Sequence, residues 1–304
     1  MASLRVTQGI LVLRSMRNLN DHMRKILSLQ DELSTGLRVN SPSDDPIDAR
    51  RAIDARTSIG TSEQYLDNMS MVGPQLEETA QCVLTSIDIV ERVRELTLQG
   101  ANATNSQLQL DEIANEVNQL LEAMVVESNH QTNGRYIFSG TRTLQEAFTE
   151  TRDANGNITA VTYNGNTEDI NVAVADGIEI TANMSGQEAF LNNIDTFQVL
   201  IDVRDDLLAG DYNSLEMTRL DELKTIREQL LRATAEIGAV QNRLDRTIAN
   251  TEDFVVQLER VKSDSVDADY AETVINLNAA SNAYQAGLNA AARTIQPSLL
   301  DYVR

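Results

Sequence analysis

The sequence Leu33-Ser-Thr-Gly-Leu-Arg-Val-Asn-Ser-Pro-Ser-Asp-Asp-Pro46 contains the signals for the end of one helix and the start of another. Gly36 can adopt the left-handed backbone conformation that commonly ends a helix, and Leu37 can then fold back onto the last turn. Asp45 is suited to cap the following helix, and Pro46 is suited to its first position. The stretch therefore predicts a sharp corner between two helices.

The residues before this corner form a pattern in which apolar side chains recur at alternating steps of four and three. That spacing is typical of a coiled-coil seam, in which one helix packs against another. An isolated helix of this length is only marginally stable in water, so the segment needs a facing partner. The predicted seam residues are Val12, Met16, Leu19, Met23, Ile26 and Leu33, with Gln30 as the polar interruption.

The C-terminal residues repeat this spacing over a similar length. The predicted seam residues are Tyr270, Val274, Leu277, Tyr284, Leu288, Ala291 and Ile295, with the polar Ser281 between them. Residues 1–40 carry six basic and three acidic side chains, whereas residues 264–304 carry two basic and five acidic ones. Because opposite charges attract, the two segments should pair with each other rather than with themselves.

Long helices are also predicted between the two seams, because no proline lies between Pro74 and Pro297. Helical periodicity extends from Pro46 to about Met69 and resumes at Pro74, which predicts an interruption between them. A glycine- and asparagine-containing stretch that starts at Gly100 predicts a further break. The central part of the chain should therefore consist of long rods.

A β-rich insertion is predicted over about residues 146–189, where apolar residues alternate with polar ones. Asn-Gly and Asp-Gly pairs favour the positive backbone angles of tight hairpin turns. Such pairs occur at Asn133-Gly134, Asn155-Gly156, Asn164-Gly165 and Asp176-Gly177. The modest apolar content of the insertion predicts a thin core.

Together these patterns predict a mainly α-helical protein with a small β insertion. A long helical coiled-coil or bundle trunk would hold the N- and C-termini side by side, with the antiparallel β domain at its tip. The predicted divisions are residues 1–43 (N-terminal coiled-coil segment), 44–145 (trunk), 146–189 (β-rich outer domain), 190–263 (trunk) and 264–304 (C-terminal coiled-coil segment).

The sequence contains no spacing typical of a catalytic or metal site. His22 and His130 are the only histidines and lie on separate segments, and Cys82 is the only cysteine. Neighbouring residues therefore cannot assemble a catalytic triad or a zinc site. Cys82 falls within a helical pattern and is interpreted as a buried, inert thiol. We predict a non-enzymatic protein with no catalytic, cofactor-binding or metal-binding residues.

Charge and hydropathy limit the partners and the route of export. The net charge of −21 argues against nucleic acid and anionic membranes as partners, because phosphate binding requires clustered lysine and arginine. The apolar run Ile10–Leu13 is too short for a cleavable secretion signal. No run approaches the roughly 20 apolar residues of a membrane span. The sequence therefore predicts neither a cleavable signal peptide nor a membrane segment.

Three stretches together resemble the bacterial flagellin superfamily. They are residues 33–46, the sequence Asn133-Gly-Arg-Tyr-Ile-Phe-Ser-Gly-Thr141 and the ending Ala291-Ala-Arg-Thr-Ile-Gln-Pro-Ser-Leu-Leu-Asp-Tyr-Val303. The likeness covers most of the chain except the β insertion. The second stretch and the Ser-Pro-Ser-Asp-Asp-Pro form of the first are more similar to the hook-associated junction proteins of that superfamily than to flagellin itself.

The resemblance implies how the seams work. In that superfamily the terminal segments are disordered in the free monomer and form an inner coiled coil when subunits stack in a tube. The corner connects this inner layer to an outer helical layer. By this resemblance the corner residues are Gly36, Leu37, Arg38, Asn40 and Asp45, with Leu33 leading into them.

The resemblance also implies partners and a location. The protein would form a homo-oligomeric ring at the hook–filament junction, between hook-associated protein 1 and the flagellin filament. A flagellar export chaperone would guard the C-terminal seam, and the flagellar type III export apparatus would deliver the chain to the outside without a cleavable signal.

Three alternatives remain open from the sequence. The chain could be flagellin, the filament subunit itself. It could instead be an intracellular helical scaffold or signalling coiled coil, whose ends would be folded in the monomer. A third interpretation gives the β insertion a role in binding a host or surface ligand, although its composition singles out no pocket.

Overall fold

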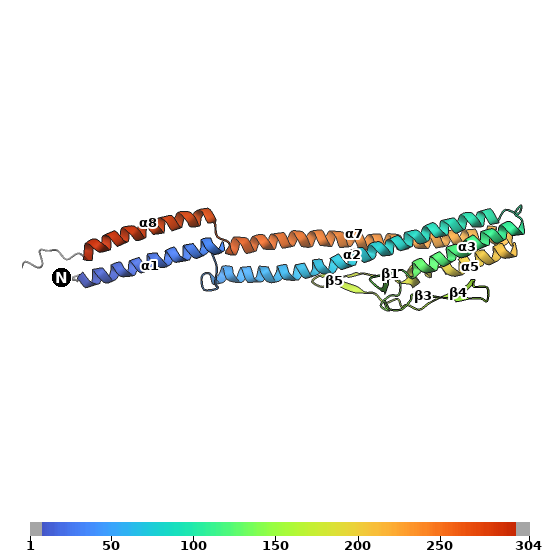
Figure 1. Cartoon of the computed structure of the whole chain (residues 1–304), viewed down its shortest axis with the longest axis horizontal. Coiled ribbons are helices and arrows are strands. Elements are labelled where there is room, and N and C mark those ends of the chain that lie inside the picture. The colour runs from blue at the N-terminus through green and yellow to red at the C-terminus, as the bar shows by residue number, and fades with distance from the viewer. Residues whose placement is uncertain (1–7, 296–304) are drawn as a thin grey trace, which may run out of the picture. The chain divides into compact units, whose positions relative to one another are not determined.

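The computed structural model describes residues 8–295, which form long helices and short β-hairpins (Figure 1). The chain divides into two compact units. The first unit contains the described residues up to Thr61 together with those from Phe254 onward, and the second contains residues 62–253. The boundaries of these compact units fall within long helices and do not correspond to the divisions predicted from the sequence. Those divisions therefore remain predictions.

In the first unit, α1 (Gln8–Thr35) leads into the predicted corner. Gly36 follows it with a φ of +74°, which is the left-handed conformation expected of a helix-ending glycine. After the corner, α2 (Pro46–Gly100) begins. The Asp45 carboxylate caps α2 by accepting hydrogen bonds from the backbone N–H groups two and three residues later, at 3.0 and 3.1 Å. Both ends of the corner therefore form as their residue types predict.

The C-terminal side of this unit contains the end of α7 (Leu220–Val266) and all of α8 (Tyr270–Ile295). Asp269 caps α8 as Asp45 caps α2, with its carboxylate 2.9 and 3.1 Å from the N–H groups two and three residues later. Helices α1 and α8 lie side by side (Figure 1). They run antiparallel, because Leu37 pairs with Asp267 while Leu19 meets Gly287.

In the second unit, α2 continues through Pro74 without a break, so the interruption predicted between Met69 and Pro74 is wrong. Proline removes one backbone hydrogen bond and crowds the preceding turn. Packing outweighs that cost here, because Met69, Val72 and Leu76 on either side of the proline are all buried in the core. The sequence pattern around Pro74 shows the local penalty but not the tertiary contacts that compensate for it.

Further helices follow α2 in the second unit. The break predicted after Gly100 forms, and it is followed by α3 (Gln107–Ser128), α5 (Thr196–Ala209), the short α6 (Tyr212–Ser214) and a π-helical turn η1 (Leu215–Arg219) that leads into α7. The start of α3 meets the end of α5, because the Gln107 side-chain amide donates to the Leu208 carbonyl at 3.0 Å. These contacts close one end of the helices of this unit.

Within residues 8–295 the β-structure consists of three separate two-stranded antiparallel hairpins. The strands are β1 (Gln131–Thr132) with β2 (Arg135–Tyr136), β3 (Phe148–Arg152) with β4 (Ile158–Tyr163), and β5 (Asn171–Ala175) with β6 (Ile178–Thr181), followed by the short helix α4 (Gly186–Phe190). Three of the four predicted turn pairs connect paired strands. The fourth, Asn164-Gly165, does not, because Gly165 lies against the Tyr163 side chain and the chain moves on to the next hairpin.

An aromatic cluster anchors this region to the helices. The Phe148 ring lies with its centroid 4.8 Å from that of Phe197, 5.7 Å from that of Phe190 and 5.1 Å from that of Tyr163. Strand β3 packs on α3 and β4 packs on α5. The hairpins therefore lie along the sides of these helices and not at the tip predicted for them. Burial of their aromatic residues against the helix faces explains the difference.

Replacing the buried Leu121 of α3 by alanine should lower the free energy of unfolding by about 2–5 kcal/mol, because it removes packed atoms and leaves a cavity. Leu108→Ala in the same helix is the matched control, since Leu108 is 70% exposed, and it should change stability by less than about 0.5 kcal/mol. Denaturant unfolding of the full chain measures both. Equal effects would show that the core of this unit is not packed as described.

Candidate assembly interface

The corner is attached to the junction between α7 and α8 by backbone hydrogen bonds. The N–H groups of Arg38 and Val39 both donate to the Val266 carbonyl, at 2.7 and 3.3 Å. In return, the Ala268 N–H donates to the Gly36 carbonyl at 2.9 Å. These bonds need no particular side chain beyond the glycine that turns the backbone. They fix the register between the N-terminal and C-terminal segments of the first unit.

The Arg38 side chain adds an ionic contact to the same junction. Its guanidinium donates to the Asp48 carboxylate at 2.7 Å and to the Ser265 carbonyl at 2.8 Å. Asp45 lies farther from it, at 3.9 Å. The hydrogen bond from Arg38 lowers the pKa of the Asp48 carboxyl below its ordinary range, and the charges of Arg38 and Arg51 act in the same direction. Arg38 therefore joins the start of α2 to the end of α7.

Two polar residues shape the inside of the corner. The Asn40 side-chain amide donates to the Leu37 carbonyl at 3.3 Å. The Asp44 carboxylate accepts hydrogen bonds from the N–H groups of Asn40 and Ser41, at 3.2 and 2.8 Å. Asp44 was not among the predicted corner residues. The pair of aspartates before Pro46 was the available signal, since one carboxylate closes the turn and the other caps the helix.

The predicted seam of α1 coincides only in part with the face that α8 covers. Val12, Leu19, Ile26 and Leu33 are at least half-buried, as a seam requires. Met16 and Met23 are 55% and 39% exposed, whereas Ser15, His22 and Leu29 on the same helix are less exposed. The covered stripe therefore has the same steps as the predicted one but is rotated toward these three residues.

Helix α8 shows the same rotation. Val274, Leu277 and Tyr284 are partly buried and Ala291 is buried, whereas Tyr270 and Leu288 are 67% and 44% exposed. The side chain of Ile295 lies outside the described residues. The buried positions that the prediction missed are Thr273 and Ala280.

Small residues on α8 allow α1 to approach closely. A Cβ atom on Gly287 would lie only 3.2 Å from the Leu19 side chain, which is tighter than ordinary contact. Ala280 and Ala291 are buried on the same helix. The face of α8 that packs on α1 therefore buries little apolar area. The two helices are closely packed, but their shared interface is thin.

Large apolar side chains of the first unit remain exposed to solvent. They follow α1 at Ile10, Leu13, Met16, Met23 and Leu27, and they occur on the other helices of this unit at Ile47, Ile53, Phe254, Val256, Val261, Tyr270, Ile275 and Leu288. Large apolar side chains exposed repeatedly along one helix favour a surface that a partner covers. We call the α1 set, from Ile10 to Leu27, the outer stripe.

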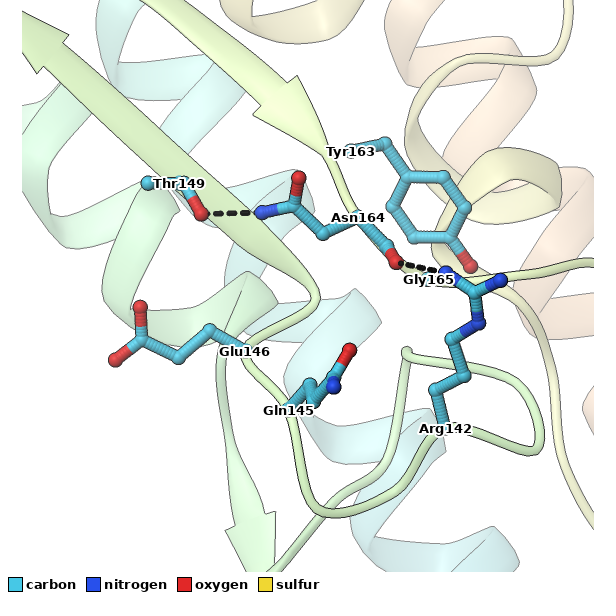
Figure 2. A pocket seen from close by; sticks show the side chains of 7 residues that line it. All are labelled: Arg142, Gln145, Glu146, Thr149, Tyr163, Asn164 and Gly165. Atoms are coloured by element: carbon cyan, nitrogen blue, oxygen red, sulfur yellow. Dashed lines mark hydrogen bonds between the residues drawn. The ribbon is translucent and has the colours of Figure 1, made fainter.

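A polar cavity of about 690 Å³ lies beside the hairpins of the second unit (Figure 2). Its lining residues are Arg142, Gln145, Glu146, Thr149, Tyr163, Asn164 and Gly165. Figure 2 shows that they bond to one another: Arg142 donates to the Asn164 carbonyl, and the Asn164 amide contacts Thr149. The Tyr163 hydroxyl donates to backbone carbonyls of the same unit, so these groups hold the loop in place.

Replacing Arg38 by glutamine should raise the pKa of the Asp48 carboxyl toward its ordinary value of 3.8. A carboxyl with a lowered pKa stabilises the folded corner above pH 3.8, and this contribution is lost as the pH falls through the lowered value. NMR titration of the Asp48 carboxyl carbon measures the change. Arg51→Gln, which removes the more weakly acting neighbour, should raise the pKa less; an equal or larger rise would contradict the role of Arg38.

Among the described residues, no helix has both the length and the uninterrupted apolar character needed to cross a membrane. Residues 6–143 match the bacterial flagellin N-terminal helical region, and residues 220–303 match the bacterial flagellin C-terminal helical region. A flagellin from Salmonella choleraesuis is 28% identical over 237 residues, which cover 77% of this chain and 41% of that flagellin. The chain thus spans less than half the length of this relative.

Solved structures with a similar fold come from hook-associated proteins. A protein described as a flagellar hook-associated protein from Vibrio parahaemolyticus has a TM-score of 0.66 at 21% identity, covering 74% of this chain and all of that one. The flagellar junction protein of Legionella pneumophila has a TM-score of 0.61 at 13% identity, covering 71% of this chain and all of that one. The chain belongs to the bacterial flagellin family and has the fold of these hook-associated proteins.

Proposed function

We propose that this flagellar protein forms the adaptor ring at the hook–filament junction on which flagellin polymerises. The observation that carries the proposal is the outer stripe on a thin helix pair, which leaves apolar surface for neighbouring copies to cover. The fold shared with a flagellar junction protein over the whole length of that protein supports the same position in the flagellum. A filament subunit would share the terminal helices but is much longer among the relatives that match in sequence.

Assembly would complete the first unit. Fully burying an apolar side chain of this size is worth about 1.5–3 kcal/mol, so covering the outer stripe would add several such contributions to each subunit. The α1–α8 pair alone cannot bury both faces of α1. Neighbouring subunits in a ring would supply the missing faces and convert the terminal helices into an inner coiled coil. The predicted seam residues that face the partner helix within the chain and those that face solvent would then all contribute to one interface.

The corner would set where this inner layer ends. The bonds between the corner and the α7–α8 junction hold the two terminal helices together as a pair. A ring subunit needs such a rigid attachment, because both helices must meet their neighbours in register. Gly36, Leu37, Arg38, Asn40 and Asp45 would therefore act through the position of the terminal helices rather than by contacting a neighbouring subunit themselves.

The proposed partners follow from this position. The ring would consist of copies of this chain, with hook-associated protein 1 on the hook side and flagellin on the filament side. Before assembly, a flagellar export chaperone would cover the C-terminal seam, and the type III export apparatus would carry the chain to the outside of the cell without a cleavable signal. The acidic net charge of −21 supports the expectation that neither nucleic acid nor a membrane is a partner.

Flagellin itself is the second candidate function, because the matched relatives named flagellin align with both ends of the chain. The two candidates differ in what the purified chain does alone. We expect the full chain, concentrated under conditions that polymerise flagellin, to form no long filaments. Electron microscopy of the sample measures this, and robust growth of micrometre-long filaments would favour flagellin over the adaptor.

A strain that lacks this chain should produce hooks without filaments and lose flagellin to the medium, and the wild-type gene should restore swimming. The same gene carrying Met16→Asp should fail to restore it, because a buried charge at the outer stripe would oppose subunit packing. Electron microscopy, immunoblots of the medium and spreading in soft agar measure these outcomes.

Asn18→Asp is the matched control, since Asn18 is an exposed polar residue on the same helix and gains the same charge. It should restore swimming. Circular dichroism should show equal helix content in both purified variants, because Met16 is already exposed in the single chain. Normal swimming with Met16→Asp would rule out the outer stripe as an assembly surface.

A further inference from the structure

Three residues of the second unit bring metal-ligating atoms together away from the assembly surface. One ligand atom from each of Cys82, Glu127 and His130 lies within 4.8 Å of the other two. Cys82 is on α2 and is 3% exposed, Glu127 is in the last turn of α3, and His130 follows that helix. Residue spacing does not predict this group, because it is the fold that brings α2 to the end of α3.

A further carboxylate lies beside His130, at the edge of this group. The Glu78 carboxylate lies 3.9 Å from the His130 imidazole nitrogen Nε2. Glu78 and Cys82 are one turn apart on α2, whereas Glu127 and His130 are three residues apart at the end of α3. The spacing of Glu78 and Cys82 places both on one side of α2, whereas His130 lies beyond the end of α3 and is placed by the turn that follows the helix. Two elements therefore each present a pair of ligands to a common space.

We propose that Cys82, Glu127 and His130 bind a zinc ion, with Glu78 as the fourth ligand. Zinc prefers four ligands in a tetrahedron and accepts thiolate, imidazole and carboxylate donors together. Zinc bond lengths place the ligand atoms of such a tetrahedron about 3.3–3.8 Å apart. The ligand atoms of the present group are within 4.8 Å of one another, at most about 1–1.5 Å wider than in such a tetrahedron, and rotation of the half-buried Glu127 side chain can close that difference.

The surroundings of the four residues fit a metal site. The Thr132 hydroxyl, at the start of the β1–β2 hairpin, donates to the Glu78 carboxylate and orients it, as outer residues do around metal ligands. Cys82 closes the site on its buried side, and the exposed His130 leaves a path for the ion to enter. Two carboxylates beside the thiol provide the negative charge that a divalent cation requires.

Zinc binds the thiolate form of cysteine, and the surroundings of Cys82 oppose formation of that thiolate in the metal-free chain. Burial raises the pKa of the Cys82 thiol to about 12, and the neighbouring Glu127 carboxylate acts in the same direction. In the metal-free chain the thiol therefore keeps its proton at neutral pH. Zinc binding would release that proton to the solvent as the sulfur–metal bond forms.

A bound ion would tie α2 to the turn between α3 and β1. It would stabilise the second unit by mass action, since only the folded chain brings the four ligands together. This inference goes beyond the proposed function and is independent of it. A chain that failed to act as the junction adaptor could still bind zinc here. A chain that bound no zinc here could still act as the adaptor.

Cobalt(II) titration of the purified, metal-free full chain tests the site. Cobalt takes the same tetrahedral ligands and, unlike zinc, gives a sulfur-to-metal charge-transfer absorption in the near ultraviolet. We expect this absorption to saturate at one equivalent of cobalt and to disappear when one equivalent of zinc is added. Zinc should also raise the thermal unfolding midpoint of the wild-type chain. The absence of a saturable thiolate band would overturn the proposal.

Three single substitutions assign the ligands. Cys82→Ser should abolish the charge-transfer band, while His130→Gln and Glu127→Gln should each weaken cobalt binding by more than about tenfold. Because His130 and Glu127 are partly exposed, replacing either should disturb folding less than replacing the buried Cys82. Circular dichroism of all three variants should match that of the wild type.

His22→Gln is the matched control, because His22 is the only other histidine of the chain and lies on α1, outside this unit. It should bind cobalt as the wild type does. Equal binding by the wild type, His130→Gln and Glu127→Gln, or loss of binding in His22→Gln, would show that the metal is held elsewhere.

Discussion

The shared carbonyl of Val266 is the contact on which the organisation of the terminal helices depends. Two successive N–H groups of the corner, those of Arg38 and Val39, donate to it, and the Gly36 carbonyl accepts from the chain just beyond. Only a left-handed residue at position 36 brings these groups to the α7–α8 junction. Once this backbone contact is made, α1 and α8 extend from it side by side and antiparallel, and their facing residues are fixed.

The two units differ in how completely they bury their apolar residues. The second unit contains a core of large side chains, including Phe148, Phe190 and Phe197, that helices and hairpins share. The buried residues of the first unit include small ones such as Ala280 and Ala291, and many of its large apolar side chains remain exposed. A close-packed pair of helices with small residues at its interface gains little from its own contacts. It is therefore suited to form its full interface with other copies.

Local sequence signals predicted local structure well. Gly36 and Asp45 carry their own conformational preferences, so the corner could be predicted from residue type alone. The steps of the seams were also correct, but periodicity cannot decide which of two adjacent apolar stripes meets the partner within the chain. Leu29 and the small residues of α8 take that position, and Met16 and Met23 remain outside. Predicting which stripe faces α8 would have required the distance between the axes of α1 and α8, which residue spacing does not provide.

Features that depend on tertiary contacts could not be predicted in the same way. The continuation of α2 through Pro74 depends on buried neighbours on both sides of the proline. The position of the hairpins depends on aromatic contacts between residues far apart in the sequence. The Cys82, Glu127 and His130 group likewise joins positions more than forty residues apart, so no spacing rule would find it.

Amide hydrogen exchange of the isolated full chain, followed by mass spectrometry, tests most directly whether the terminal helices need neighbouring subunits. We predict nearly unprotected amides in residues 8–35 and 270–295, because this thin pair of helices opens readily, and strong protection for the core of residues 62–253. Strong protection of both terminal helices in the isolated chain would show that the pair is self-sufficient and would contradict assembly-coupled folding.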